Sequence, residues 1–359
     1  MKHICFSITA HGFGHGAISC SVINCLMAQY PHIKISVMTL LPKAYLDSRL
    51  AGEFDYYPMG SDFGMLMATP IEIDIENSRQ KYQTLYENWQ SYVETEKDQL
   101  ATMKADMLIS NISPISLDAA HQLGIQTASV APFNWAQIYQ AYCLNEERAT
   151  QAVYRKMMSV YEKVDQVFKP LPFVPLGDGK EIEIASINDQ PVAQMDVLLS
   201  KLPKSVKKIG LLALGGLPFP LDLAQWPEIE SLHWLVDQTP PSARADMTQI
   251  GQLNLPFLSL IACSDLIITK PGYGTYCEIA ALAKYKKVRV LSLQRPDWPE
   301  TPYLKRFLSR RVPFVEVSQS QLKGESLRQV IIEINQVEYP DEMSCQSGAQ
   351  QLVKALSIL

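Results

Sequence analysis

The stretch Asp265-Leu-Ile-Ile-Thr-Lys-Pro-Gly-Tyr-Gly-Thr-Tyr-Cys-Glu278 joins a short apolar run to two closely spaced glycines. Its first residues, Asp265 to Thr269, predict a buried strand, and the glycines predict a tight turn before a helix over Gly274 to Tyr285, with Thr275 able to cap it. A helix that begins directly after such a turn directs its first backbone amides at an anion. The segment therefore predicts a strand–turn–helix corner that binds a diphosphate, with a purely structural corner as the alternative.

A second glycine-rich corner lies near the N-terminus, where His11-Gly-Phe-Gly-His-Gly16 follows the apolar run Ile4 to Thr9. Gly12-x-Gly14-x-x-Ala17 fits the spacing of a dinucleotide-binding loop. That kind of site also needs an acid at the end of the second strand to hold a ribose, and this chain has Ser36-Val-Met-Thr-Leu-Leu41 there. We therefore expect no nicotinamide or flavin cofactor.

The two histidines of this corner are candidate catalytic residues. The rest of the loop consists almost entirely of small residues, so the imidazoles of His11 and His15 have little apolar surface to pack against. Histidine titrates near neutral pH and can remove a proton from a hydroxyl group. A catalytic role is favoured for His15 and balanced against a structural one for His11. No third ligand stands at a zinc-like spacing, so no metal site is expected.

Composition narrows the class of protein. A length of 359 residues fits two domains, and 47% hydrophobic with 19% charged residues is typical of a globular protein. The net charge of -5 speaks against a nucleic-acid partner. Seven cysteines without paired spacing, and the absence of a signal-peptide pattern, predict a cytoplasmic protein. Two basic clusters, Lys204 to Lys208 and Lys284 to Lys287, leave a peripheral membrane contact open. The oligomeric state is not predictable.

Strand and helix signals alternate in both halves of the chain, which predicts α/β domains with parallel sheets. Apolar spacing predicts one long helix over Asn77 to Met103 and another over Glu146 to Phe168. The Pro- and Gly-rich stretch Lys169 to Gly179 predicts a linker. We expect an N-terminal domain over 1–168, a linker region over 169–200 and a C-terminal domain over 201–340. The Met-rich segment Asp62 to Pro70 is interpreted either as an acceptor loop or as buried packing.

Four segments, in order, carry a resemblance to a known family. They are His11 to His15, Ala131-Pro-Phe-Asn-Trp-Ala-Gln-Ile-Tyr139, Lys270 to Glu278, and Arg295-Pro-Asp-Trp-Pro-Glu300. Together they resemble the glycosyltransferase-like half of plant arabinokinases. More distantly, the chain is similar to the bacterial peptidoglycan N-acetylglucosaminyltransferase, a GT-B enzyme. The sugar-kinase half of arabinokinases has no counterpart in this sequence, so kinase activity is not expected.

The resemblance implies two Rossmann-like domains that face each other across a cleft, with the nucleotide-sugar on the C-terminal one. It also implies that no metal and no cofactor is needed, and that a helix within 341–359 crosses back to the N-terminal domain. His15, with His11 beside it, would act as the base on an acceptor. The residues that it places at the donor are Gly215, Gly216, Gln252, Leu253, Gly272, Tyr273, Gly274, Thr275, Glu278 and Glu300. Those that it places on the acceptor side are Gly12, Gly14, Phe133, Asn134 and Trp135.

Within that set, Gly272 to Thr275 would cradle the diphosphate with Gly215 and Gly216, and Glu278 would bind the ribose. Gln252 and Leu253 would contact the nucleobase of the donor, and Glu300 would contact the donor sugar. One departure weakens the acceptor assignment, because Ile18 and Ser19 replace the Arg or Pro that usually follows the loop histidine.

The expected function is transfer of a sugar from a nucleotide-sugar, with a UDP-sugar as the favoured donor, to a hydroxyl acceptor. Hydrolysis of a nucleotide-sugar, with water in place of the acceptor, is one alternative. A protein of this fold that binds a nucleotide-sugar without turnover is another. The sequence does not predict the acceptor, or whether the reaction retains or inverts the anomeric configuration.

Overall fold

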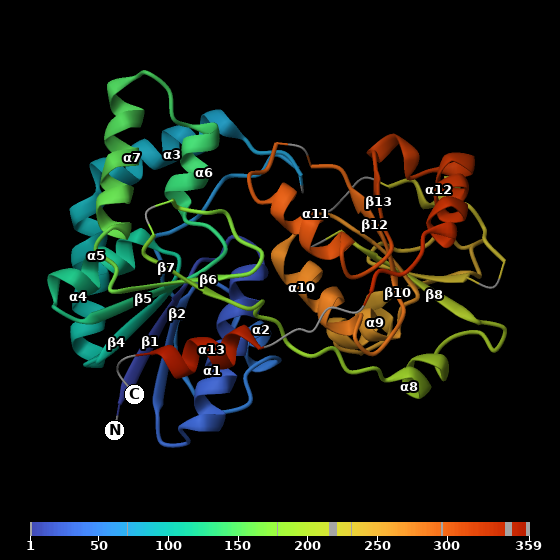
Figure 1. Cartoon of the computed structure of the whole chain (residues 1–359), viewed down its shortest axis with the longest axis horizontal. Coiled ribbons are helices and arrows are strands. Elements are labelled where there is room, and N and C mark those ends of the chain that lie inside the picture. The colour runs from blue at the N-terminus through green and yellow to red at the C-terminus, as the bar shows by residue number, and fades with distance from the viewer. Residues whose placement is uncertain are drawn as a thin grey trace. The chain divides into compact units, whose positions relative to one another are not determined.

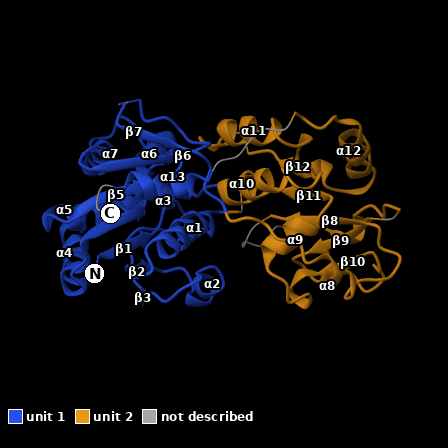
Figure 2. Ribbon diagram, turned by 60° about the horizontal axis from the view of Figure 1, so that its bottom comes forward, with its two compact units in different colours: residues 1–68, 72–188, 346–359 blue, residues 69–71, 189–345 orange. Residues whose placement is uncertain are grey.

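The computed structural model describes residues 2–69, 71–177, 179–214, 221–230, 232–295, 297–341 and 347–356. The chain divides into two compact units, shown in different colours in Figure 2. Unit 1 comprises residues 1–68, 72–188 and 346–359, and unit 2 comprises residues 69–71 and 189–345. Among the described residues, no helix has both the length and the apolar character needed to span a bilayer.

Unit 1 is built on a seven-stranded parallel sheet with the strand order β3-β2-β1-β4-β5-β6-β7. Its strands are β1 (His3–Ile8), β2 (Lys34–Thr39), β3 (Asp55–Tyr57), β4 (Met107–Asn111), β5 (Gln126–Val130), β6 (Gln166–Pro170) and β7 (Glu181–Ile184). Its helices are α1 (Gly14–Gln29), α2 (Lys43–Asp47), α3 (Ile75–Glu87), α4 (Trp89–Met103), α5 (Pro114–Gln122), α6 (Trp135–Tyr142), α7 (Arg148–Tyr161) and α13 (Gly348–Ala355). The central strands β1 and β4 are buried along their whole length, as expected for parallel strands covered on both faces.

The two long helices that apolar spacing predicts in unit 1 are shorter in the structure. The helix expected over Asn77 to Met103 is interrupted at Asn88, whose side-chain amide donates to the Thr84 carbonyl at 2.9 Å and ends α3. The helix expected over Glu146 to Phe168 ends at Tyr161, and β6 follows it. Spacing alone misled the second prediction, because the last apolar residues of the expected helix pair with β5.

Two segments that lie far apart in the sequence complete unit 1. Residues 169–200, expected as a linker region, contain the end of β6, all of β7 and the helix α8 (Met195–Leu199), and unit 1 continues to Asn188. Helix α13 lies beside α1 in Figure 1. The Ala185 amide donates to Gln351 Oε1 at 2.6 Å, and a Cβ on Gly348 would stand 1.9 Å from the Ala185 carbonyl oxygen. Only glycine fits at the start of α13.

Unit 2 is built on a six-stranded parallel sheet with the order β10-β9-β8-β11-β12-β13. Its strands are β8 (Lys208–Ala213), β9 (Leu232–Val236), β10 (Met247–Gln249), β11 (Leu266–Thr269), β12 (Arg289–Leu293) and β13 (Phe314–Val317). Besides α8, its helices are α9 (Phe257–Cys263), α10 (Tyr273–Leu282), α11 (Thr301–Ser309), α12 (Gly324–Gln336) and the 3-10 turns η1 (Leu223–Gln225), η2 (Ile250–Gln252) and η3 (Gln319–Gln321).

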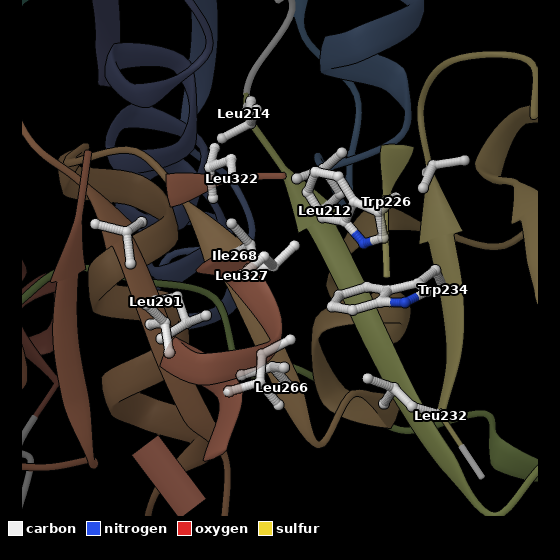
Figure 3. Close-up of a cluster of buried hydrophobic side chains, with 14 of the residues drawn as sticks. Leu212, Leu214, Trp226, Leu232, Trp234, Leu266, Ile268, Leu291, Leu322 and Leu327 are labelled. Atoms are coloured by element: carbon white, nitrogen blue, oxygen red, sulfur yellow. The ribbon is translucent and has the colours of Figure 1, made fainter. Parts of the chain in front are cut away.

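The core of unit 2 packs two tryptophans against the sheet, as Figure 3 shows. The rings of Trp226 and Trp234 meet edge to face, with centroids 5.5 Å apart. Gly210 on β8 leaves room for them, because a Cβ there would stand 2.5 Å from Trp234 Cε3. The core therefore depends on the absence of a side chain at this strand position.

Both sheets reverse their strand order at one point, between β1 and β4 in unit 1 and between β8 and β11 in unit 2. In open parallel sheets, ligands bind beyond the carboxyl ends of the strands at such a switch point. The two glycine-rich corners follow β1 and β11, one at each switch point.

Candidate functional site

The base candidate of unit 1 is held at its switch point by an amide. His15 is the second residue of α1 and is buried, and its Nδ1 atom lies 2.8 Å from Oδ1 of Asn111, the last residue of β4. The Nδ2 group of Asn111 donates to the His15 carbonyl at 3.1 Å and to Ser19 Oγ at 3.2 Å. Because the amide nitrogen is committed to those acceptors, Oδ1 faces the ring and must accept from it.

This arrangement selects one tautomer of His15. Nδ1 carries the proton that Asn111 accepts, so Nε2 keeps its lone pair and is the basic nitrogen. Burial lowers the pKa of His15 to about 4, and the bond to Asn111 offsets only part of that effect. The imidazole is therefore neutral, and able to accept a proton, over the whole physiological pH range.

An aromatic cluster surrounds the two histidines. The buried ring of Trp135, at the first turn of α6, lies 5.2 Å from the His11 ring and 5.5 Å from the His15 ring, centroid to centroid. Phe133 packs edge-on against His15 at 5.8 Å. The structure thus brings together four of the residues predicted from sequence, including the half-buried His11.

The other acceptor-side predictions differ in what their atoms do. Asn134 is the N-cap of α6. Its side-chain Oδ1 accepts from the backbone amide of Gln137 at 2.9 Å, and its backbone amide donates to Gln137 Oε1 at 3.0 Å. This capping box gives its side chain a structural task. Gly12 has a φ of +75°, a backbone conformation that favours glycine, whereas Gly14 begins α1.

In unit 2, the predicted phosphate corner is the N-terminus of α10. Gly272 is the N-cap, and no side chain caps this end of the helix within the described parts of the chain. Thr275 was expected to cap, but the helix begins at Tyr273, so Thr275 lies inside the first turn with Gly274. The backbone amides of this turn point out of the helix end and suit a phosphate.

Positive charge gathers next to this turn. Lys270 follows β11, and burial together with the positive charge of Arg295 lowers its pKa to about 8. The guanidinium of Arg295 lies 4.1 Å from the centre of the Trp298 ring, and Trp298 Nε1 donates to Glu300 Oε2 at 3.3 Å. Lys270 follows β11 and Arg295 follows the neighbouring strand β12. These two cations and the N-terminus of α10 suit a diphosphate.

The remaining donor-side predictions are placed as follows. Glu278 is buried about one turn into α10, and Glu300 is the buried N-cap residue of α11. Gln252 is exposed at the end of η2, whereas the Leu253 side chain is buried and its carbonyl accepts from Lys201 Nζ. Gly215 and Gly216 lie outside the described residues.

Four further residues of these corners were not predicted from the sequence: Asn111, Asp62, Lys270 and Arg295. Lys270 and Arg295 stand inside segments that carry the family resemblance, so their charge was a usable signal. Asn111 and Asp62 had no local signal, because each acts on residues far along the chain. Asp62, at the start of the Met-rich segment, is buried, as is Met65, which favours packing for this part of the segment.

Comparison with known proteins agrees with the fold. No family model matches the chain. The chain is 23% identical over 324 residues to L-arabinokinase of Arabidopsis thaliana. The matched region covers 86% of this chain but only 30% of L-arabinokinase. The glycosyltransferase of kitacinnamycin superposes with a TM-score of 0.62 at 15% identity, covering 93% of this chain and 91% of that one.

Two further structures widen the comparison. UGT71G1 of Medicago truncatula, solved in complex with UDP-glucose, gives a TM-score of 0.56 at 11% identity and covers 98% of this chain and 92% of that one. MurG of Acinetobacter baumannii gives 0.52 at 16% identity, with full coverage of both chains. The chain has the GT-B fold. Each unit carries one Rossmann-like sheet, as the sequence predicted.

Proposed function

We propose that this GT-B protein is a glycosyltransferase that moves a sugar from a nucleotide-sugar to a hydroxyl acceptor, with a UDP-sugar as its donor. The observation that carries the proposal is the His15–Asn111 pair, which presents a neutral imidazole at the switch point of unit 1. The UDP-glucose complex of UGT71G1 supports the choice of nucleotide.

In the proposed reaction, Nε2 of His15 takes the proton of the acceptor hydroxyl. The acceptor oxygen forms a bond to the anomeric carbon as that carbon's bond to the diphosphate oxygen breaks. The leaving diphosphate carries the electron pair away, and we assign its stabilisation to the first-turn amides of α10 and to the cations Lys270 and Arg295. These groups would perform without a metal ion what a divalent cation performs in other phosphate sites.

The acceptor side supports a neutral acceptor. The loops after β1, β2, β4 and β5, residues 9–13, 40–42, 112–113 and 131–134, contain no Asp, Glu, Lys or Arg. The segment after β3 does contain acidic residues, of which Asp62 is buried. Two large apolar side chains in these loops are half exposed, Phe13 at 48% and Leu40 at 55%. The Phe13 ring is held 4.7 Å from the Tyr45 ring. We therefore propose that the acceptor is an uncharged hydroxyl compound with an apolar surface.

The test starts with binding and proceeds to turnover. Thermal shifts with UDP, GDP, dTDP and their sugars identify the donor, because a ligand that binds only the folded state raises the melting temperature. Release of nucleoside diphosphate is then measured with and without phenolic, free-sugar and phosphorylated acceptors. We expect release that depends on a neutral acceptor and is strongly reduced in His15→Ala, while donor binding is retained.

Other outcomes separate the alternatives. Rapid release of free sugar without any acceptor would identify a nucleotide-sugar hydrolase. Tight donor binding that survives His15→Ala, with no turnover in the wild type, would identify a binding protein. No thermal shift with any nucleotide would overturn the donor site itself.

A further inference from the structure

A buried carboxylate that the proposed reaction does not use lies behind the histidine pair. Asp62 stands in the segment between β3 and α3 and is only 7% exposed. Its Oδ2 atom accepts from Trp135 Nε1 at 2.9 Å and from the hydroxyl of Thr9, and its Oδ1 atom accepts from the Gly64 amide at 3.2 Å. These donors come from three separate segments of unit 1.

The residues that donate these hydrogen bonds connect Asp62 to the surroundings of His11 and His15. Trp135 contacts both imidazole rings, so the bond to its indole nitrogen sets the plane of the ring that His11 and His15 pack against. Thr9 directly follows β1, and its hydroxyl also accepts from the amide of Ile112 at 3.3 Å. Ile112 is the residue after Asn111, the amide that orients His15.

The loop that supplies Asp62 is itself tightly held. Gly64 has a φ of +68°, and a Cβ there would stand 2.6 Å from the Trp135 ring and 2.7 Å from His11 Cγ. On the other side of Asp62, the amide and hydroxyl of Ser61 donate to Glu96 at 3.1 Å and 2.8 Å. Glu96 is buried on α4 and also accepts from Ser116. The loop is therefore fixed from both ends.

Burying the Asp62 carboxylate costs free energy, which argues that the carboxylate has a functional role. Burial raises the pKa of Asp62, although Thr9, Gly64 and Trp135 oppose that shift by hydrogen bonding to the charged form. A charged acceptor strengthens each of these bonds and fixes donor directions more firmly than a neutral one. Packing alone would be served as well by an apolar side chain of similar volume.

We propose that Asp62 is a positioning residue of the acceptor side, which holds the Trp135 indole against His11 and His15 and so keeps both imidazoles in place. Its consequence for turnover rests on the proposed function, but the placement of the rings does not. The effect on catalysis follows from geometry, since a shift of about 1 Å in a reacting group can cost roughly 10²-fold in rate.

The chain offers a matched control. In the same unit, the indole of Trp89 donates to Asp118 Oδ2 at 2.6 Å, and Asp118 is 8% exposed. Asp118 also pairs with Lys156 at 2.8 Å, and none of its hydrogen-bond partners is one of the two loop histidines. Asp118→Asn therefore changes the same kind of carboxylate–indole bond without touching the candidate site.

The experiment compares Asp62→Asn, Thr9→Val and Asp118→Asn with the wild type. The imidazole resonances of His11 and His15 are followed by NMR, and donor affinity and kcat are measured wherever the wild type turns over. We expect Asp62→Asn to shift both imidazole signals, with an unchanged donor Kd and a roughly 10²-fold lower kcat. Thr9→Val leaves all rings intact but removes the donor to Asp62 and the acceptor of Trp135 Nε1 at 3.4 Å and of the Ile112 amide at 3.3 Å. It should shift the same signals, and Asp118→Asn should leave them unmoved.

The two proposals fail in different ways. Unmoved imidazole signals in a folded Asp62→Asn or Thr9→Val protein would overturn the role of Asp62, as would equal shifts in Asp118→Asn. If Asp62→Asn does not fold, Thr9→Val decides. A wild type without turnover would overturn the glycosyltransferase, and the imidazole signals would still decide the role of Asp62.

Discussion

The Nδ1 atom of His15 lies 2.8 Å from the Oδ1 atom of Asn111, so a neutral amide, and not a carboxylate, orients the candidate base. An amide selects the tautomer but provides no charge to stabilise an imidazolium. The pKa of His15, lowered to about 4 by burial, reflects that difference.

Asn111→Asp should raise the pKa of His15, because a carboxylate beside Nδ1 favours the charged ring by about 1–3 units. The acidic limb of the pH–rate profile, expected near pH 4 in the wild type, should move upward by a similar amount. A pH–kcat/KM series on both proteins, with an NMR titration of His15, checks this. If the acidic limb of the Asn111→Asp profile lies at the same pH as that of the wild type, His15 is not the base.

His15 should also make folding sensitive to acid. Its pKa falls from 6.5 to about 4 on folding, so below pH 6.5 the unfolded chain binds a proton that the folded chain refuses. The wild type should therefore lose about 3 kcal/mol of unfolding free energy relative to His15→Gln between pH 7 and pH 4. Asp62 and Glu96 act in the opposite sense, because their pKa values are raised, but they are common to both proteins. Urea unfolding at several pH values measures the difference, which should be absent at pH 8.

Nucleotide affinity should fall above pH 8. The pKa of Lys270 is lowered to about 8, so its ammonium, the form that attracts a diphosphate, is lost between pH 7 and pH 9. About a tenth of the protein still carries the charged lysine at pH 9, so losing a charge-assisted bond of about 1.5–3 kcal/mol weakens UDP binding by up to roughly 10-fold between pH 7 and pH 9. Lys270→Arg should bind UDP with little change across this range, because guanidinium stays charged. Calorimetric titration at pH 7 and pH 9 tests this, with the exposed Lys204→Ala as the control. Equal affinities for the wild type at both pH values would remove Lys270 from the donor site.

Gly210→Ala should destabilise unit 2. The new methyl group would stand 2.5 Å from Trp234 Cε3, in a core that cannot expand without moving the Trp226–Trp234 pair. Overpacking of this kind costs about 1–3 kcal/mol. Thermal unfolding measures it, with Gly251→Ala as the control because no atom lies within 4 Å of a Cβ there. A melting temperature equal to that of the control would show that the tryptophans repack.

Strand patterns were the most predictable part of the fold. The buried strand predicted over Asp265 to Thr269 is β11 (Leu266–Thr269), because buried parallel strands are short runs of β-branched and aliphatic residues. Prediction failed where the same apolar spacing fits both a helix and a strand. Residues 166–168 look like the end of a long helix, yet they pair with β5.

What the sequence by itself determined is the pair of glycine corners and the candidate site residues within them. His15 at the start of α1 and Gly272 at the start of α10 are local facts, because a glycine turn and a helix start depend on neighbouring residues. Only the tertiary structure decided which nitrogen of His15 is basic and what holds Trp135 in place. Asn111 and Asp62 reach their partners across 96 and 73 residues, and such contacts leave no period or motif in the sequence.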